Sequence, residues 1–423
     1  MGSVVELNLT RVEGHGSVKV YREGSRVERV ELCLTDSPRL FEALLVGKSY
    51  LEVPEIVCRI CSLCSTVHKV AALLAVENAF GVEVSEATAL TRALIMQGGM
   101  IQDHALHLYC LLLPDLLGVP GLTGLAQKAP ELLKTGLAVK RVGNMIQETV
   151  GGRLIHPVNI RLGGLGLQVG KKELLRLRQE LLSVIPACRE AYRLFRTPFP
   201  FPELPSPNAL ALEPCENGQV TSARCRMGGG NSFAVAAYRE AVEESVLPYS
   251  NAKYSKVMGK EATVGSLARL CLGVSLSTQA QAIFDEVKHE ILDKDIRGNS
   301  LAQAIELCDA AERALELIDR LLDQAPGALG NVTPVPCQGS GSAACEAPRG
   351  LLIHSYGFDA DGICTYADVV TPTALNQGAM ARDLLALARG MEGEDTEKMT
   401  MALERMIRCY DPCISCSVHV LKA

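Results

Sequence analysis

The sequence predicts an α+β fold that is predominantly helical, with a small antiparallel sheet at the N-terminus and further strands near residues 216–232 and 350–370. Three patterns favour this fold. Apolar and polar residues alternate near the N-terminus, as in strands with one buried face. From Pro38 onward, apolar residues recur mostly at helical spacing. Alternation returns over residues 350–370 and is typical of a hairpin.

The whole chain, residues 1–423, is interpreted as a single domain. Its parts are an N-terminal sheet over about 1–36, a helical core over about 37–195 and 234–410, and a C-terminal segment, 411–423. Strands are expected at about 5–9, 17–21 and 27–34. Helices are expected at about 64–80, 87–113, 127–150, 171–195, 234–246, 276–293, 299–324, 373–390 and 395–409. The glycine-rich segment 151–170 and the proline-rich segment 197–209 are expected to be irregular.

Composition excludes several classes of protein. The chain is 48% hydrophobic, which is enough for a sizeable core. Its net charge is −6 and it has no basic run, so we expect no nucleic-acid partner. No segment approaches the roughly 20 apolar residues of a membrane span, and the first residues lack a secretory pattern. A cytoplasmic protein is therefore expected.

The sixteen cysteines are many for a reducing compartment, where disulfides are uncommon. Isolated cysteines among apolar neighbours are expected to be buried in the core. They are Cys33, Cys110, Cys188, Cys271, Cys308 and Cys364. Clustered cysteines require another explanation.

Two pairs of cysteines lie at opposite ends of the chain: Cys61 with Cys64, and Cys413 with Cys416. Two-residue spacing lets both sulfurs of a pair reach one metal ion, and four thiolates suit zinc, nickel or iron. The fold must bring the pairs together, which makes 411–423 a metal-binding segment. His68 follows the first pair and His419 the second, as further ligands or as donors to the thiolates.

The spacing alone leaves two alternatives open. A structural zinc site would use the same four cysteines. An iron–sulfur cluster is the other alternative, because Cys58 extends the first pair to CxxCxxC. The fourth ferredoxin-type cysteine with its proline is missing after Cys64, so Cys58 is expected to be a buried neighbour.

An ordered set of motifs runs through nearly the whole chain. The first cysteine motif is Arg59–Cys64 with His68, and the last is Asp411–Cys416 with His419. The other motifs, in order, are Arg11–His15, His104–Tyr109, Gly151–Pro157, Val264–Arg269, Glu346–Gly350 and Pro372–Asn376. This set specifically resembles the large, catalytic subunit of nickel–iron hydrogenases, and the two cysteine motifs match that family's two signatures.

The resemblance implies reversible heterolytic cleavage of H2 to protons and electrons. It implies that Cys61 and Cys413 are terminal nickel ligands. It also implies that Cys64 and Cys416 bridge nickel to an iron that carries one carbonyl and two cyanides. Thiolates are soft donors that suit such a centre.

Other roles are carried over in the same way. Arg349 would point its guanidinium at the open metal position, Pro348 and Thr373 would contact the cyanides, and His68 would be a further cofactor-binding residue. Glu13 would take a proton from Cys413 as a buried carboxylate with a raised pKa. From the sequence alone, a surface salt bridge between Arg349 and Glu346, and a capping or strand-edge role for Glu13, are also open.

The family also has a magnesium site. By resemblance its ligands would be Glu42, His419 and a backbone carbonyl near Val369, since hard cations prefer oxygen. In isolation, Glu42 is interpreted as an ordinary surface glutamate. One departure from the family pattern is Ser62, which stands where the family usually has glycine after the first cysteine.

The resemblance implies a partner, because the family's large subunit has no iron–sulfur cluster of its own. An iron–sulfur small subunit and further flavin, ferredoxin-like or heterodisulfide-reductase subunits are expected. The lead-in Glu52–Val57 resembles the cytosolic branch, either bidirectional or linked to heterodisulfide reductase. Two other functions stay open. The first is an electron-transfer scaffold like the related subunit of respiratory complex I, although that subunit lacks the four cysteines. The second is a zinc-stabilised structural subunit.

Overall fold

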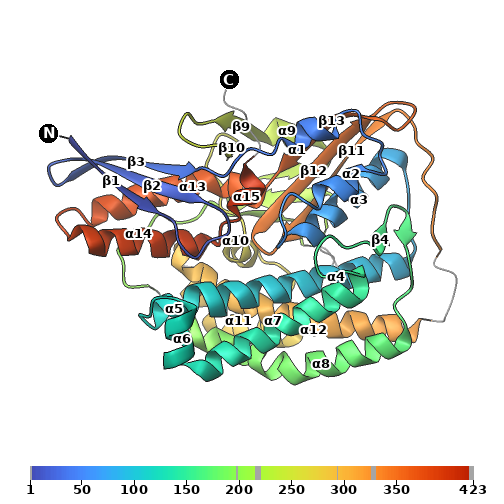
Figure 1. The fold of residues 1–423 in the computed structure, drawn as a ribbon, viewed down its shortest axis with the longest axis horizontal. Coiled ribbons are helices and arrows are strands. Elements are labelled where there is room, and N and C mark those ends of the chain that lie inside the picture. The colour runs from blue at the N-terminus through green and yellow to red at the C-terminus, as the bar shows by residue number, and fades with distance from the viewer. Residues whose placement is uncertain (1, 197–198, 215–220, 293, 325–329, 419–423) are drawn as a thin grey trace.

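The computed structural model describes residues 2–196, 199–214, 221–292, 294–324 and 330–418. Helices form one layer, and several small antiparallel sheets with their own helices form a second layer above it (Figure 1). The α+β prediction is confirmed. Among the described helices, every one is too short or too polar to span a lipid bilayer.

The helical layer is built around α4 and α7, which cross closely. A Cβ atom on Gly143 would lie 2.6 Å from the backbone nitrogen of Gln102, so only glycine permits this approach. The hydroxyl of Ser85 caps α4 by accepting from Thr88 N. The layer comprises α4 (Glu86–Ala105), a π-helix (Leu106–Leu112), α5 (Leu113–Leu116), α6 (Leu122–Lys128), α7 (Pro130–Gly151), α8 (Lys171–Glu190), α11 (Thr278–Ile291) and α12 (Asn299–Asp323).

The central sheet lies above this layer and has the order β11-β12-β13. Its strands are β11 (Gly339–Ala347), β12 (Gly350–Phe358) and β13 (Cys364–Val370), and β12 is buried throughout. Helix α3 (Ser65–Phe80) packs against it and is largely buried. The short helices α1 (Phe41–Leu45) and α2 (Val53–Val57) precede α3. The hairpin predicted at 350–370 is confirmed as β12 and β13.

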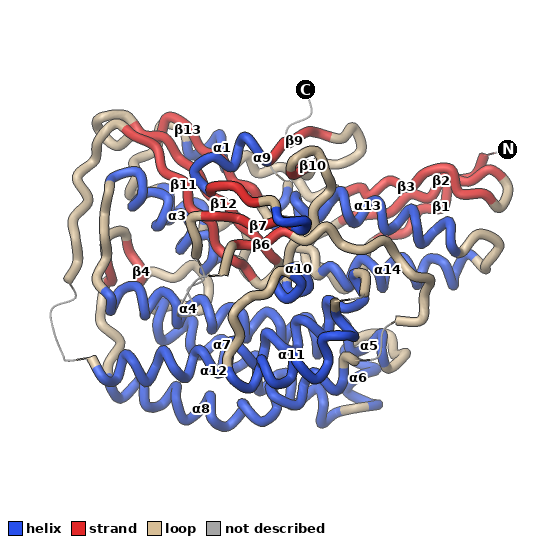
Figure 2. Tube along the Cα trace, turned by 180° about the vertical axis from the view of Figure 1, so that it is seen from behind, coloured by secondary structure: helices blue, strands red, loops and turns tan. Residues whose placement is uncertain are grey.

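The N-terminal sheet has the predicted three strands, β1 (Gly2–Asn8), β2 (Gly16–Glu23) and β3 (Arg26–Leu34). Helix α13 (Pro372–Gly390) packs against β3 and against α14 (Thr396–Tyr410). The short α15 (Ile414–Ser417) in turn contacts α13. These contacts place the C-terminal helices beside the N-terminal sheet, and Figure 2 shows α13 and α14 next to β1–β3 from behind.

The remaining strands lie in smaller sheets. They are β4 (Ile160–Arg161), β5 (Gly164–Leu165), β6 (Leu210–Leu212), β7 (Arg224–Met227), β8 (Ser232–Ala234), β9 (Val242–Val246) and β10 (Lys253–Val257), with α9 (Tyr238–Ala241) and α10 (Ser266–Cys271). The strands predicted near 216–232 are confirmed over the described part, as β7 and β8. Residues 197–198 and 215–220 lie outside the described residues.

Two expectations about individual elements are wrong. The helix expected at 234–246 covers only α9, because Val242–Val246 pairs with β10 instead and tertiary pairing overrides local propensity. Strand β11 was not predicted, since its sequence is rich in glycine, serine and alanine. Those small residues have a packing reason, because a Cβ atom on Gly341 would lie 2.1 Å from the carbonyl oxygen of Ala75 in α3.

Candidate metal centre

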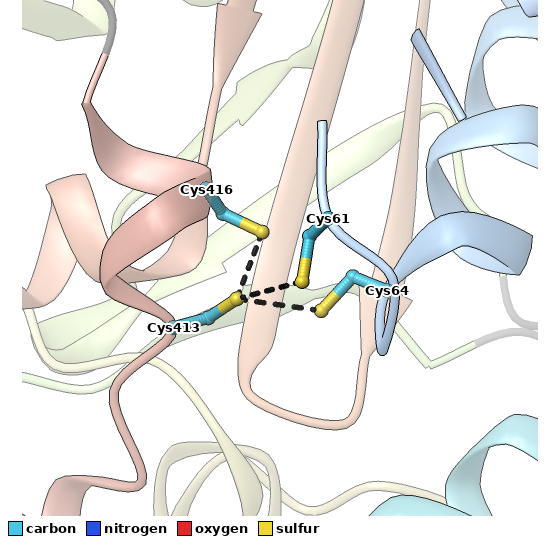
Figure 3. A group of neighbouring side chains, drawn as sticks. All are labelled: Cys61, Cys64, Cys413 and Cys416. Atoms are coloured by element: carbon cyan, nitrogen blue, oxygen red, sulfur yellow. Dashed lines mark hydrogen bonds between the residues drawn. The ribbon is translucent and has the colours of Figure 1, made fainter. Parts of the chain in front are cut away.

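The four predicted cysteines meet in one buried group (Figure 3). Their sulfur atoms all lie within 4.8 Å of one another. The Sγ atom of Cys413 lies 3.4 Å from that of Cys61, 3.7 Å from that of Cys64 and 2.9 Å from that of Cys416. Sulfurs at such distances can share one or two metal ions.

Each pair is positioned at the end of a helix. Cys61 lies in the turn between α2 and α3, and Cys64 is the residue that precedes α3. Cys413 precedes α15 and Cys416 lies within it. The backbone of Cys413 forms a bridge with Glu13, and Ile414 N donates to the Glu13 carbonyl at 3.1 Å. The N-terminal segment therefore holds the C-terminal pair in place.

The electrostatics of the group favour a metal cation. Hydrogen bonds from Cys413 and Cys416 hold the pKa of Cys61 well below its usual value. Burial raises the pKa of Cys413 and of Cys416 well above the usual value of a cysteine thiol. A cluster of buried thiols that cannot all ionise without a counter-charge is stabilised when a metal ion replaces the protons. The all-sulfur donor set fits soft or borderline metals such as nickel, iron and zinc.

Arg349 lies beside this group and is buried. Its Nη1 lies 3.5 Å from Cys64 Sγ and 3.1 Å from Asp103 Oδ1, and its Nε donates to Asp411 Oδ1 at 3.1 Å. The alternative of a surface salt bridge with Glu346 is wrong, because Glu346 instead binds Arg269 at 2.7 Å. Burial and the nearby Asp411 raise the pKa of Asp103 to about 6, even though Arg349 opposes the shift.

Thr373, Glu13 and His68 touch the C-terminal cysteine segment, whereas Pro348 contacts Arg269. The Oγ1 of Thr373 accepts from Cys413 N at 2.8 Å, which leaves its proton free for another acceptor. Glu13 is half-buried, and its Oε2 accepts from Ser415 N at 3.0 Å. Pro348 is buried in the turn between β11 and β12, where Arg269 Nη2 donates to its carbonyl at 3.2 Å. His68 Nε2 lies 3.5 Å from Cys416 Sγ.

His68 belongs to a buried chain of side chains. Its Nδ1 lies 3.0 Å from His354 Nε2, and His354 Nδ1 lies 2.5 Å from Tyr356 Oη. Burial lowers the pKa of His68 to about 4, so the ring is neutral near pH 7. A neutral ring with its tautomer fixed by a neighbour can donate to a thiolate.

The predicted magnesium ligands are only partly described. Glu42 is not an ordinary surface residue, because its Oε1 accepts from Lys253 Nζ at 2.7 Å and from Val369 N at 2.8 Å. Lys253 also contacts Glu244 at 2.9 Å and Asp368 at 3.1 Å. Burial raises the pKa of Glu42 against the pull of Lys253. His419 lies outside the described residues.

The structure also answers the remaining sequence expectations. Ser62 is exposed, and Cys58 is buried outside the four-sulfur group, with its Sγ 3.2 Å from the Glu55 carbonyl. The six cysteines expected in the core are buried, except that Cys271 is partly exposed.

Sequence reasoning missed Asp103, Asp411 and His354 as site residues. It also missed Arg39 and Asp36, which bind the carbonyl and the hydroxyl of Ser415 at 3.1 and 3.0 Å. The signal for Asp103 was available, since an aspartate in a helix that is otherwise buried needs a cationic partner.

Comparisons with known proteins agree with this geometry. The family model for nickel-dependent hydrogenases matches residues 39–137 and 230–419. The chain is 36% identical to sulfhydrogenase 2 subunit alpha of Pyrococcus furiosus, over 99% of this chain and 100% of that one. It is 29% identical to the NAD-reducing hydrogenase HoxS subunit beta of Cupriavidus necator, over 98% of this chain and 94% of that one.

The fold matches a solved NAD⁺-reducing [NiFe]-hydrogenase in its H2-reduced state. The TM-score is 0.88, with 26% identity over 99% of each chain. A Ni-Fe-Se hydrogenase of Desulfovibrio vulgaris Hildenborough has the same fold, with a TM-score of 0.79 at 23% identity over 99% of this chain and 100% of that one.

Proposed function

The chain belongs to the nickel-dependent hydrogenase family, as an oxidoreductase subunit that acts on H2, and we propose that its four cysteines hold a nickel–iron centre. Cys61 and Cys413 would be the terminal nickel ligands. Cys64 and Cys416 would bridge nickel to an iron with one carbonyl and two cyanides. The observation that supports this most directly is the group of four buried sulfurs within 4.8 Å of one another.

When bound, the metal centre supplies the site at which H2 is split heterolytically. The protein's own task is then to place charge and to move a proton. Arg349 contributes a permanent positive charge beside Cys64, fixed in orientation by Asp103 and Asp411. Pro348 and Thr373 would contact the two cyanides, and His68 would hydrogen-bond the Cys416 thiolate.

Glu13 would accept the proton carried by the Cys413 thiol. Its backbone pairs with Cys413, and its carboxylate accepts from the amide of Ser415, so it is held beside the C-terminal pair. A carboxylate in that place can take a proton from the sulfur and pass it toward the surface.

A magnesium site is proposed next to the metal centre. Three carboxylates, Glu42, Glu244 and Asp368, surround Lys253, and Arg239 also pairs with Asp368 at 3.1 Å, so the cluster offers hard oxygen donors and keeps one excess negative charge. Glu42 would be a ligand, together with His419 and the carbonyl of Val369.

The named relatives are single subunits, alpha or beta, of larger hydrogenases, and this chain likewise needs a partner subunit. We propose an iron–sulfur small subunit, with flavin, ferredoxin-like or heterodisulfide-reductase subunits beyond it. Exposed apolar residues gather in the 152–158 loop, where Leu154, Ile155 and Val158 are 36–41% exposed. That loop contacts the start of α3 through His156 N and Ser65 Oγ, one residue from Cys64. A partner docked there would receive electrons over a short distance.

The test is an infrared spectrum of the purified complex together with its elemental analysis. Bands in the metal carbonyl and cyanide region, with about one nickel and one iron per chain, are the expected result. Zinc without nickel or iron, and no such bands, would instead support the zinc-stabilised subunit. A complex without bound metal would revive the scaffold function.

Mutagenesis adds a second test of the centre. Cys413→Ala should abolish H2-dependent viologen reduction, whereas Cys188→Ala, at a buried cysteine in α8, should retain it. Retained activity in Cys413→Ala would reject the proposed ligand set.

A further inference from the structure

One guanidinium joins the two cysteine pairs. Arg39 lies just before α1 and is exposed. Its Nη2 donates to the carbonyl of Ile60, the residue before Cys61, and at 3.1 Å to the carbonyl of Ser415, the residue before Cys416. A single nitrogen therefore ties together the two segments that supply the metal ligands.

Ser415 is held at each of its polar groups. Its N–H donates to Glu13 Oε2 at 3.0 Å, its Oγ donates to Asp36 Oδ2 at 3.0 Å, and its carbonyl accepts from Arg39. All three partners come from the first 39 residues of the chain. The fit is close, because a Cβ atom on Gly14 would lie 2.7 Å from Ile414 Cβ.

The C-terminal segment needs such support. Helix α15 has only four residues, and a helix that short has no stability of its own. Its position is therefore set by contacts with other elements, and charge-assisted hydrogen bonds are the stronger ones among them. Arg39 can make two of these at once because its Nη2 carries two N–H groups, held in fixed directions by the planar guanidinium.

We infer that Arg39 is a positioning residue that locks the C-terminal cysteine pair against the N-terminal pair. It touches neither sulfur nor substrate. It acts by fixing the backbone on which Cys61 and Cys416 stand. We call this pair of Arg39 hydrogen bonds the lock. Its proposed role rests on the proposed metal centre only in assuming that the four sulfurs share a metal ion, and it holds equally for nickel or zinc.

The experiment compares Arg39→Gln and Arg39→Lys in the purified complex. Two rates are measured, the release of bound metal to a chelator and the labelling of Cys413 and Cys416 by iodoacetamide, followed by mass spectrometry. We expect both rates to rise roughly tenfold or more in Arg39→Gln, as for the loss of a charge-assisted hydrogen bond. Arg39→Lys should be intermediate, because the ammonium keeps the charge but its N–H groups are not held in the fixed directions of the Arg39 Nη2.

Arg29→Gln is the matched control, because its guanidinium pairs with Glu31 and stacks on Tyr21 instead. Cys188 and Cys308, buried in the helical layer, report unfolding of the whole chain. Faster labelling of Cys413 and Cys416 with these two protected supports the lock, even in a variant isolated without metal.

Two results would overturn the inference. The first is wild-type rates in both Arg39 variants, and the second is parallel labelling of all four cysteines, which would mean global unfolding. Infrared bands and metal content are recorded separately, so that failure of the lock is distinguished from failure of the proposed nickel–iron centre.

Discussion

The Nη1 atom of Arg349 lies 3.5 Å from the Sγ atom of Cys64, while Asp103 and Asp411 hold the same guanidinium from other sides. A buried cation with two carboxylate partners is fixed in direction as well as in charge. The pKa of Arg349 is raised well above its usual value, because Asp103 and Asp411 outweigh the cost of burial. The positive charge beside the sulfurs is therefore permanent.

Arg349→Lys tests whether the shape of the donor matters as well as its charge. A lysine keeps the charge but cannot bind both aspartates and face Cys64 at once. We expect H2 turnover to fall by on the order of 100-fold, with metal content unchanged. The measurement is viologen reduction per bound nickel. The control is Arg313→Lys, at a pair with Asp309 in α12, and equal losses in both variants would contradict a specific role.

Glu13→Gln tests the proton acceptor. Glutamine keeps the size of the side chain and can still accept from Ser415 N, but it cannot take up a proton. We expect H2 production to be suppressed, with less effect on the first step of H/D exchange at the metal. Glu6→Gln, on strand β1, should behave like the wild type. Turnover of Glu13→Gln at the wild-type rate would remove Glu13 from the mechanism.

Much of the fold was predictable because periodicity reports burial. The N-terminal strands, α11, α12 and α14 follow clear apolar patterns. Strand β11 was missed because its glycine-, serine- and alanine-rich sequence gives no apolar alternation, and β9 was missed because only its first residue is buried. The four cysteines were found by their spacing and the matching motifs. Arg39 and Asp36 were missed because their contacts with Ser415 exist only after the two ends of the chain meet.

Glu42→Gln tests the magnesium site. The neutral amide removes one hard anionic donor, while Lys253 still has Glu244 and Asp368, so the cluster should stay folded. We expect magnesium per chain, measured by elemental analysis after desalting, to drop well below the wild-type value. Glu240→Gln, on α9, is the control. Full magnesium content in Glu42→Gln would show that the carboxylate is no ligand.

Glu306→Gln tests the ion pair beneath the loop that carries Arg349. Arg269 donates to Glu306 at 2.6 Å from both Nε and Nη2, and also to the carbonyls of Ala347 and Pro348 at 3.0 and 3.2 Å. Burial alone would raise the pKa of Glu306, but Arg269 lowers it below its usual 4.5. Loss of the carboxylate leaves a buried cation without its main partner. We therefore expect the free energy of unfolding at pH 7 to fall by about 3–5 kcal/mol.

The pH dependence follows from the direction of that shift. A carboxyl group whose pKa is lower in the folded state contributes its stability above the unfolded value, and this contribution is lost as the pH falls below about 4.5. The wild type should therefore lose stability on acidification more steeply than Glu306→Gln. As a result, the difference between their free energies of unfolding should narrow as the pH falls. Urea unfolding midpoints between pH 7 and 3.5 measure this, with the exposed Glu397→Gln as the control. If the difference in free energy of unfolding between the two proteins stays constant down to pH 3.5, Glu306 is not the ionised partner of Arg269.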